Sequence, residues 1–83
     1  MTKENMANII SELKARNEAL VNDMKSLTSE FNEFMQDLAQ FSHEFTISFK
    51  ISQFTSKITS MREELGMNKN TINNYTLIIE GME

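Results

Sequence analysis

The sequence predicts a mainly α-helical protein in which one long N-terminal helix precedes a strand–helix–helix unit, the whole forming a dimer. Apolar residues recur in alternating steps of three and four through the first half of the chain, which is the pattern of a coiled-coil helix. Residues 45–52 alternate without exception between apolar and polar side chains, as a half-buried strand does. Gly66 then separates two further helical stretches.

The composition narrows the class of protein. The 83 residues include seven methionines and six phenylalanines, but no proline, no cysteine and only two glycines. Without cysteine there is no disulfide framework, zinc–thiolate site or thiol nucleophile, and a chain this short builds a thin core. We therefore expect an interaction or binding protein rather than an enzyme, without a cofactor or metal, and an oligomer that covers the apolar residues.

The charge and hydropathy of the chain bear on its partners. The net charge of −4 argues against a protein that holds nucleic acid by bulk charge. Residues 43–83 are almost neutral, however, with four Lys or Arg against five Asp or Glu, so a local basic strip there can still meet phosphate. We expect no membrane interaction, because no stretch approaches the roughly 18 apolar residues of a span. The lack of an apolar leader and of cysteine favours a cytoplasmic location.

Residues 1–43 are predicted to form a coiled-coil or oligomerisation helix, with Thr2 as its N-cap. The sequence places apolar residues at two heptad positions over five to six heptads, more than the three or four that support a coiled-coil prediction. The d series is Met6, Leu13, Leu20, Leu27, Phe34 and Phe41, and the a series is Ile10, Asn17, Met24, Phe31, Leu38 and Phe45.

Asn17 is the polar member of this stripe and has two interpretations. A buried asparagine at an a position sets helix register and oligomer number at some cost in stability. Alternatively, Asn17 is a tolerated polar residue on a partly exposed turn. His43 is the one histidine of the chain and is expected to be a structural or surface residue.

The second unit, residues 44–83, opens with the alternating segment. A strand over 45–51 is preferred, because β-branched and hydroxyl residues together make a poor helix. Ser52 is then the N-cap of the next helix, Gly66 ends it, and Asn68 or Asn70 caps a last helix. The alternative is an all-α antiparallel hairpin of two helices over roughly 3–41 and 47–82. It rests on a second stripe with three-four spacing, made of Ile47, Ile51, Phe54, Ile58, Met61 and Leu65.

Strand, helix, glycine turn and helix in this order resemble the ribbon-helix-helix family of bacterial, plasmid and phage repressors of the Arc, MetJ and CopG type. The resemblance covers residues 45–82 and rests on FTISFKIS at 45–52 and MREELGMNKNTINNY at 61–75. It implies a homodimer whose two strands pair and enter the major groove of double-stranded DNA. The positions that match the family's base-reading residues are Thr46, Ser48 and Lys50, and those that match its phosphate contacts are Asn68, Lys69 and Asn70.

Two function classes stay open at this point. The first is a small dimeric DNA-binding transcriptional repressor or autoregulator, in which residues 1–43 also offer a surface to a protein partner. The second is a non-enzymatic helical-hairpin interaction protein, such as a secretion partner, chaperone or adaptor. The two classes differ on whether residues 45–51 form a strand or a helix.

Overall fold

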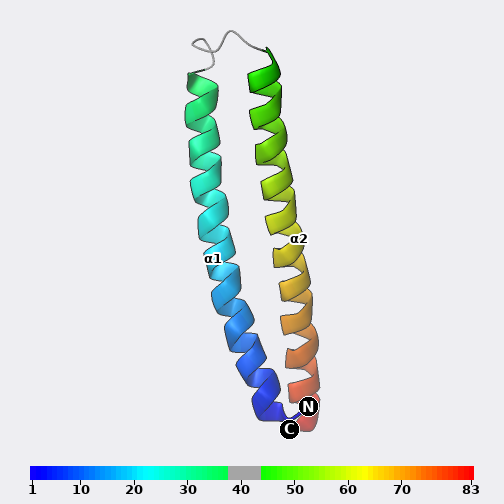
Figure 1. Ribbon diagram of the computed structural model, residues 1–83. Helices are drawn as coiled ribbons and strands as arrows, with labels where there is room; N and C mark the ends of the chain where they lie inside the picture. Colours follow the sequence, from blue (N-terminus) through cyan, green and yellow to red (C-terminus); the bar gives the residue numbers. More distant parts are fainter. Residues whose placement is uncertain (38–43) are drawn as a thin grey trace.

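The computed structural model describes residues 1–37 and 44–83, which form two long α-helices packed side by side (Figure 1). Helix α1 spans Lys3–Gln36 and helix α2 spans Glu44–Met82. The helices run antiparallel, so both chain termini lie at the same end of a rod that measures 62 × 16 × 14 Å. At that end the Lys3 ammonium lies 2.9 Å from a carboxylate oxygen of Glu83.

Helix α1 forms where the sequence predicts a helix, but it ends at Gln36, with Asp37 as its C-cap, and not at residue 43. Phe45, the last member of the predicted a series, lies in α2. The hydroxyl of Thr2 accepts a hydrogen bond of 3.1 Å from the backbone N–H of Asn5, and Glu4 places a negative charge in the first turn, where the helix dipole favours it. The heptad stripe faces α2: Met6 and Leu20 are buried, and the stripe's other members up to Phe34 are half-buried. The predicted stripe residues Leu38 and Phe41, His43, and the predicted division of the chain after residue 43 lie outside the described residues.

Helix α2 contradicts the predicted strand and, with it, the ribbon-helix-helix resemblance. Residues 45–51 are helical, and the described residues contain no strand. The strict alternation arises because residues two apart on a helix lie about 200° apart around its axis. Ile47 is half-buried and continues the stripe that packs toward α1, while Ile51, one turn later, lies at its edge and is exposed. Phe45 and Phe49, one turn apart, lie on the far side of α2, where their rings stack at 6.2 Å.

The predicted helix ends inside residues 52–70 are also wrong, because Ser52, Gly66, Asn68 and Asn70 all lie within α2. No described glycine has a positive φ, so Gly66 does not end a helix. A glycine inside a helix costs about 1 kcal/mol relative to alanine, and the packing of the following turns on α1 outweighs this cost. The turns beyond Gly66 continue the inward stripe with Asn68, Ile72, Tyr75 and Ile79, all half-buried.

The hairpin has little interior. Among the described residues only Met6, Leu20 and Ile58 are buried. The chain exposes 6252 Å², whereas a compact protein of its 9.6 kDa would expose about 5,100 Å². Its radius of gyration is 18.6 Å, against about 12 Å for a compact domain of this length. Each helix covers only one stripe of the other, so the remaining faces of both helices are exposed to solvent.

Candidate interaction surface

Four polar side chains meet between the helices near the middle of the hairpin, and we call them the polar clamp: Arg16, Asn17, Glu64 and Asn68. The side-chain amide of Asn68 donates a hydrogen bond of 3.0 Å to the amide oxygen of Asn17, in a partly buried position. The same amide group lies 3.5 Å from a carboxylate oxygen of Glu64. Asn17 and Asn68 each occupy a position of the inward stripe that an apolar residue would otherwise fill.

Arg16 and Glu64 flank the asparagine pair on its solvent side. The Arg16 guanidinium donates two hydrogen bonds to the Glu64 carboxylate, at 2.6 and 3.0 Å. These hydrogen bonds and the Arg16 charge lower the pKa of Glu64 against the opposing effect of its partial burial, and the Asn68 amide adds to the lowering. The same contact raises the pKa of Arg16. Both side chains stay 40–52 % exposed, so the pair contributes little stability by itself.

The asparagine pair and the stacked ring pair of Phe31 and Phe54 share one alignment of the two helices. Asn17 contacts Asn68, and Phe31 contacts Phe54. Phe31 lies 14 residues after Asn17 along α1, and Phe54 lies 14 residues before Asn68 along α2. A hairpin shifted by one turn would break this hydrogen bond between two half-buried amides, at a cost of about 0.5–1.5 kcal/mol. Asn17 thus contacts a residue of its own chain, and its predicted effect on oligomer number stays a prediction.

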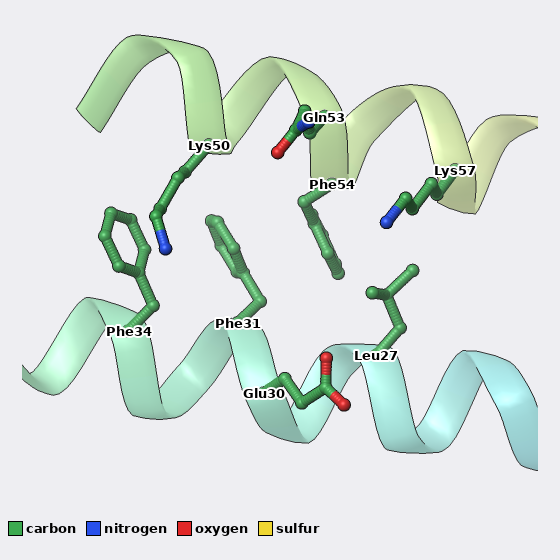
Figure 2. Close-up of a pocket in the computed structure, with 8 residues that line it drawn as sticks. All are labelled: Leu27, Glu30, Phe31, Phe34, Lys50, Gln53, Phe54 and Lys57. Carbon is green, nitrogen blue, oxygen red and sulfur yellow. The ribbon is translucent and has the colours of Figure 1, made fainter. Parts of the chain in front are cut away.

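An aromatic cluster lies between the helices toward the end of the hairpin opposite the chain termini (Figure 2). The rings of Phe31 and Phe54 stack with centroids 4.1 Å apart and planes at 11°. Phe34 lies 6.1 Å from Phe31 in a tilted arrangement, and the Lys50 ammonium lies 5.1 Å from the centre of the Phe34 ring. Figure 2 shows Lys50 and Lys57 reaching from α2 on either side of the stacked rings, over a shallow open hollow. These contacts hold the helices together.

The residues expected to contact DNA do not form one surface. Thr46 and Lys50 are one turn apart on one side of α2, whereas Ser48 lies between them in sequence and projects from another side. Thr46 is half-buried, and Ser48 and Lys50 are exposed. The ribbon that motivated their base-reading role is absent from the described residues.

The phosphate-contacting prediction placed three residues at a helix N-terminus, and α2 places them in its interior turns. Asn68 belongs to the polar clamp, while Lys69 and Asn70 are exposed. The free N–H groups that a helix N-terminus offers to phosphate are engaged within the helix at these positions.

The side of α2 that points away from α1 carries a second, unpredicted stripe, which we call the outer seam. Its members recur in steps of three and four, all are exposed, and the one charged member is Glu63. Five apolar side chains on or beside it are uncovered: Phe45 is 80 % exposed, Phe49 54 %, Met67 70 %, Leu77 58 % and Ile78 49 %. The members of the outer seam are Phe45, Phe49, Ser52, Ser56, Thr59, Glu63, Met67, Asn70, Asn74, Leu77 and Gly81.

The outward side of α1 is different in kind. It carries Glu4, Glu18, Lys25 and Glu33, together with small and polar side chains, all exposed. Met35 is the one large apolar side chain of α1 with marked exposure, at 40 %. An ordinary surface helix has one apolar stripe and one charged face. Helix α1 follows this rule, whereas α2 carries apolar residues on two opposite sides.

The outer seam was detectable in the sequence. Phe45, Phe49 and Ser52 follow three-four spacing as closely as Ile47, Ile51 and Phe54 do, and the two stripes interleave to give the period of two. A strand interpretation assigns the apolar residues of both stripes to one face of a strand, so the second helical stripe is not recognised.

Comparison with protein-family models, with curated proteins and with solved structures finds no match for this chain. Within residues 1–37 and 44–83, no group of three or more histidine, aspartate or glutamate side chains is placed to hold a metal ion. Neither described helix is long and apolar enough to cross a bilayer.

Proposed function

We propose that this chain is a non-enzymatic helical-hairpin interaction protein, of the adaptor, chaperone or secretion-partner kind, and that it binds another helix through the outer seam of α2. The observation that carries the proposal is the exposure of five large apolar side chains along one side of α2. These side chains form two groups, Phe45 and Phe49 near the start of α2 and Met67, Leu77 and Ile78 in its second half. Exposed apolar surface of several hundred Å² on a protein of this size marks an interaction site.

The charge pattern supports the same surface. Charged residues are depleted at the centre of protein interfaces and enriched elsewhere on the surface. The outer seam holds one charge over the length of α2, whereas the outward side of α1 holds four. The partner-binding surface that the sequence places in residues 1–43 thus moves, in this proposal, to α2.

Protection of engineered cysteines tests the proposal, because the chain has no native cysteine. Ser56→Cys reports on the outer seam and Ser29→Cys on the outward side of α1, and both serines are exposed. Each single-cysteine variant is expressed at native level, and its labelling by a maleimide is measured in gently permeabilised cells and again after denaturation. We expect slow labelling at Ser56→Cys and fast labelling at Ser29→Cys before denaturation. Equal, fast labelling of both variants would show that nothing covers α2 and would overturn the proposal.

A further inference from the structure

We infer that the helix that covers the outer seam is the α2 of a second copy of this chain, packed antiparallel about a two-fold axis at Glu63. This inference rests on the proposed function and names its partner. In such a pair, a residue that lies a given number of positions before Glu63 faces the residue that lies as many positions after it. The inference follows from the spacing, the side-chain sizes and the area of the outer seam.

The spacing of the outer seam is the same in both directions from Glu63. Toward the N-terminus its members follow at steps of four, three, four, three and four, and toward the C-terminus at the same steps. The average step over residues 45–81 is therefore 3.6 residues, the period of a straight α-helix, so the stripe stays on one side of α2. A two-fold axis requires a surface that is complementary to itself, and this spacing supplies one.

Away from the axis, the side chains that face each other in this arrangement match in polarity or in size, whereas at the axis Glu63 faces the like charge of Glu63 of the other copy. Phe49 faces Leu77, apolar against apolar. Phe45 faces Gly81, the largest side chain against the smallest, and nothing lies within 4 Å of the Cβ position of Gly81 in the hairpin alone. Polar members face polar members, because Ser52 pairs with Asn74 and Ser56 with Asn70.

In this arrangement a protruding side chain of one copy also faces a hollow on the other copy. Met67 projects from α2 and is 70 % exposed. It faces Thr59 of the other copy, which lines a shallow hollow on α2. Five small hydroxyl side chains form most of this hollow, with Ile51 at its edge: Ser52, Thr55, Ser56, Thr59 and Ser60. The methionine side chain is flexible enough to fill an irregular hollow of this kind.

The area available is enough for a stable dimer. The five exposed apolar side chains present about 600 Å² per copy, from their exposed fractions and about 200 Å² for a fully exposed large side chain. Two copies bury roughly 1,200 Å² of apolar surface, and the small polar members between them bring the total into the range of about 1,200–2,000 Å² of specific interfaces. The seam lies opposite α1, so the dimer is a layer of four helices in the order α1, α2, α2 and α1.

Disulfide formation between single-cysteine variants tests the antiparallel pairing. Purified Ser56→Cys and Asn70→Cys proteins, one carrying a tag, are mixed and oxidised gently. Ser56 of one copy faces Asn70 of the other, whereas the two Ser56 positions lie 14 residues apart along the seam, about 21 Å. That distance is far beyond the roughly 7 Å limit between Cα atoms for a disulfide.

We expect the mixed Ser56→Cys and Asn70→Cys disulfide to form at least about tenfold faster than the Ser56→Cys disulfide with itself. Glu63→Cys, at the axis, should link to itself rapidly, and Ser29→Cys on α1 should not. The circular dichroism of each variant establishes that it is folded. Faster self-linking of Ser56→Cys would show a parallel pair, and no linking at all would show that α2 does not bind itself. Either result overturns the inference.

The outcomes separate this inference from the proposed function. A purified protein that does not cross-link, but whose Ser56→Cys is protected in cells, binds a different helix there, and the proposed function stands. A charge swap adds an independent readout, because Glu63 faces its own copy. Wild type mixed with Glu63→Lys should form the mixed dimer in preference to either parent dimer, and a statistical mixture of the three would contradict the placement of the axis.

Discussion

The hydrogen bond between Asn17 and Asn68 is expected to couple the two helices energetically. Each single change to alanine removes this hydrogen bond and leaves one half-buried amide without its partner, so Asn17→Ala and Asn68→Ala should each lower the free energy of unfolding by about 1–2 kcal/mol. Asn17→Ala/Asn68→Ala leaves no orphaned amide, so its loss should be smaller than the sum of the two by about 1 kcal/mol.

Urea unfolding followed by circular dichroism measures this cycle, at one fixed protein concentration because association also stabilises the fold. Asn22→Ala is the matched control, since Asn22 is exposed on the outward side of α1, and its effect should stay within about 0.5 kcal/mol. Additive effects of Asn17→Ala and Asn68→Ala, within about 0.3 kcal/mol, would refute the contact. Replacing both asparagines by leucine should instead stabilise the hairpin, by about 1 kcal/mol for each half-buried side chain, and loosen its register.

Three further perturbations concern Glu64, Phe54 and Phe49. Because the folded state lowers the pKa of Glu64, the stability that its carboxylate contributes is present above the ordinary pKa of a carboxyl group and is lost as the pH falls through the lowered value. Below about pH 4.5, the melting temperature of wild type should therefore fall more steeply with pH than that of Glu64→Gln. Identical pH profiles of the two proteins would contradict this. Phe54→Ala removes half of the stacked ring pair and should destabilise the hairpin by about 2–3 kcal/mol in urea titrations, whereas a loss below about 0.5 kcal/mol would show that the rings do not pack. Phe49→Ser leaves the inner stripe intact, so sedimentation equilibrium should show at least about a tenfold weaker dimer with unchanged helicity; an unchanged dimer would place the interface elsewhere.

The sequence was sufficient to predict α1. Thr2, the stripe from Met6 to Phe34 and the long helix all follow from local rules, because a capping hydroxyl and a three-four stripe act over a few residues. Which surface covers that stripe depends on tertiary packing, which local rules do not predict. The antiparallel hairpin was present only as the alternative, and the structure supports it over the strand–helix–helix unit.

The second half was mispredicted because local preference and packing conflict there. The β-branched and hydroxyl residues of 45–52 favour a strand locally, and Gly66 followed by Met67 resembles a helix end. The long contact of α2 with α1 overrides both signals. Asn68 shows the same limit, since its role depends on facing Asn17 across the hairpin, and no spacing within either helix reveals that pairing.

The distance between spin labels on two copies of α2 tests the central claim most directly. A single nitroxide on a cysteine gives no dipolar signal in a monomer, and the chain has no native cysteine to interfere. In the antiparallel dimer, labels at Ser56→Cys should lie about 21 Å apart along the seam and labels at Ser52→Cys about 33 Å apart, since each residue away from Glu63 adds about 3 Å. A distance that grows in this way supports the self-paired outer seam. An equal, short distance at both positions, or no dipolar signal at either, would contradict it.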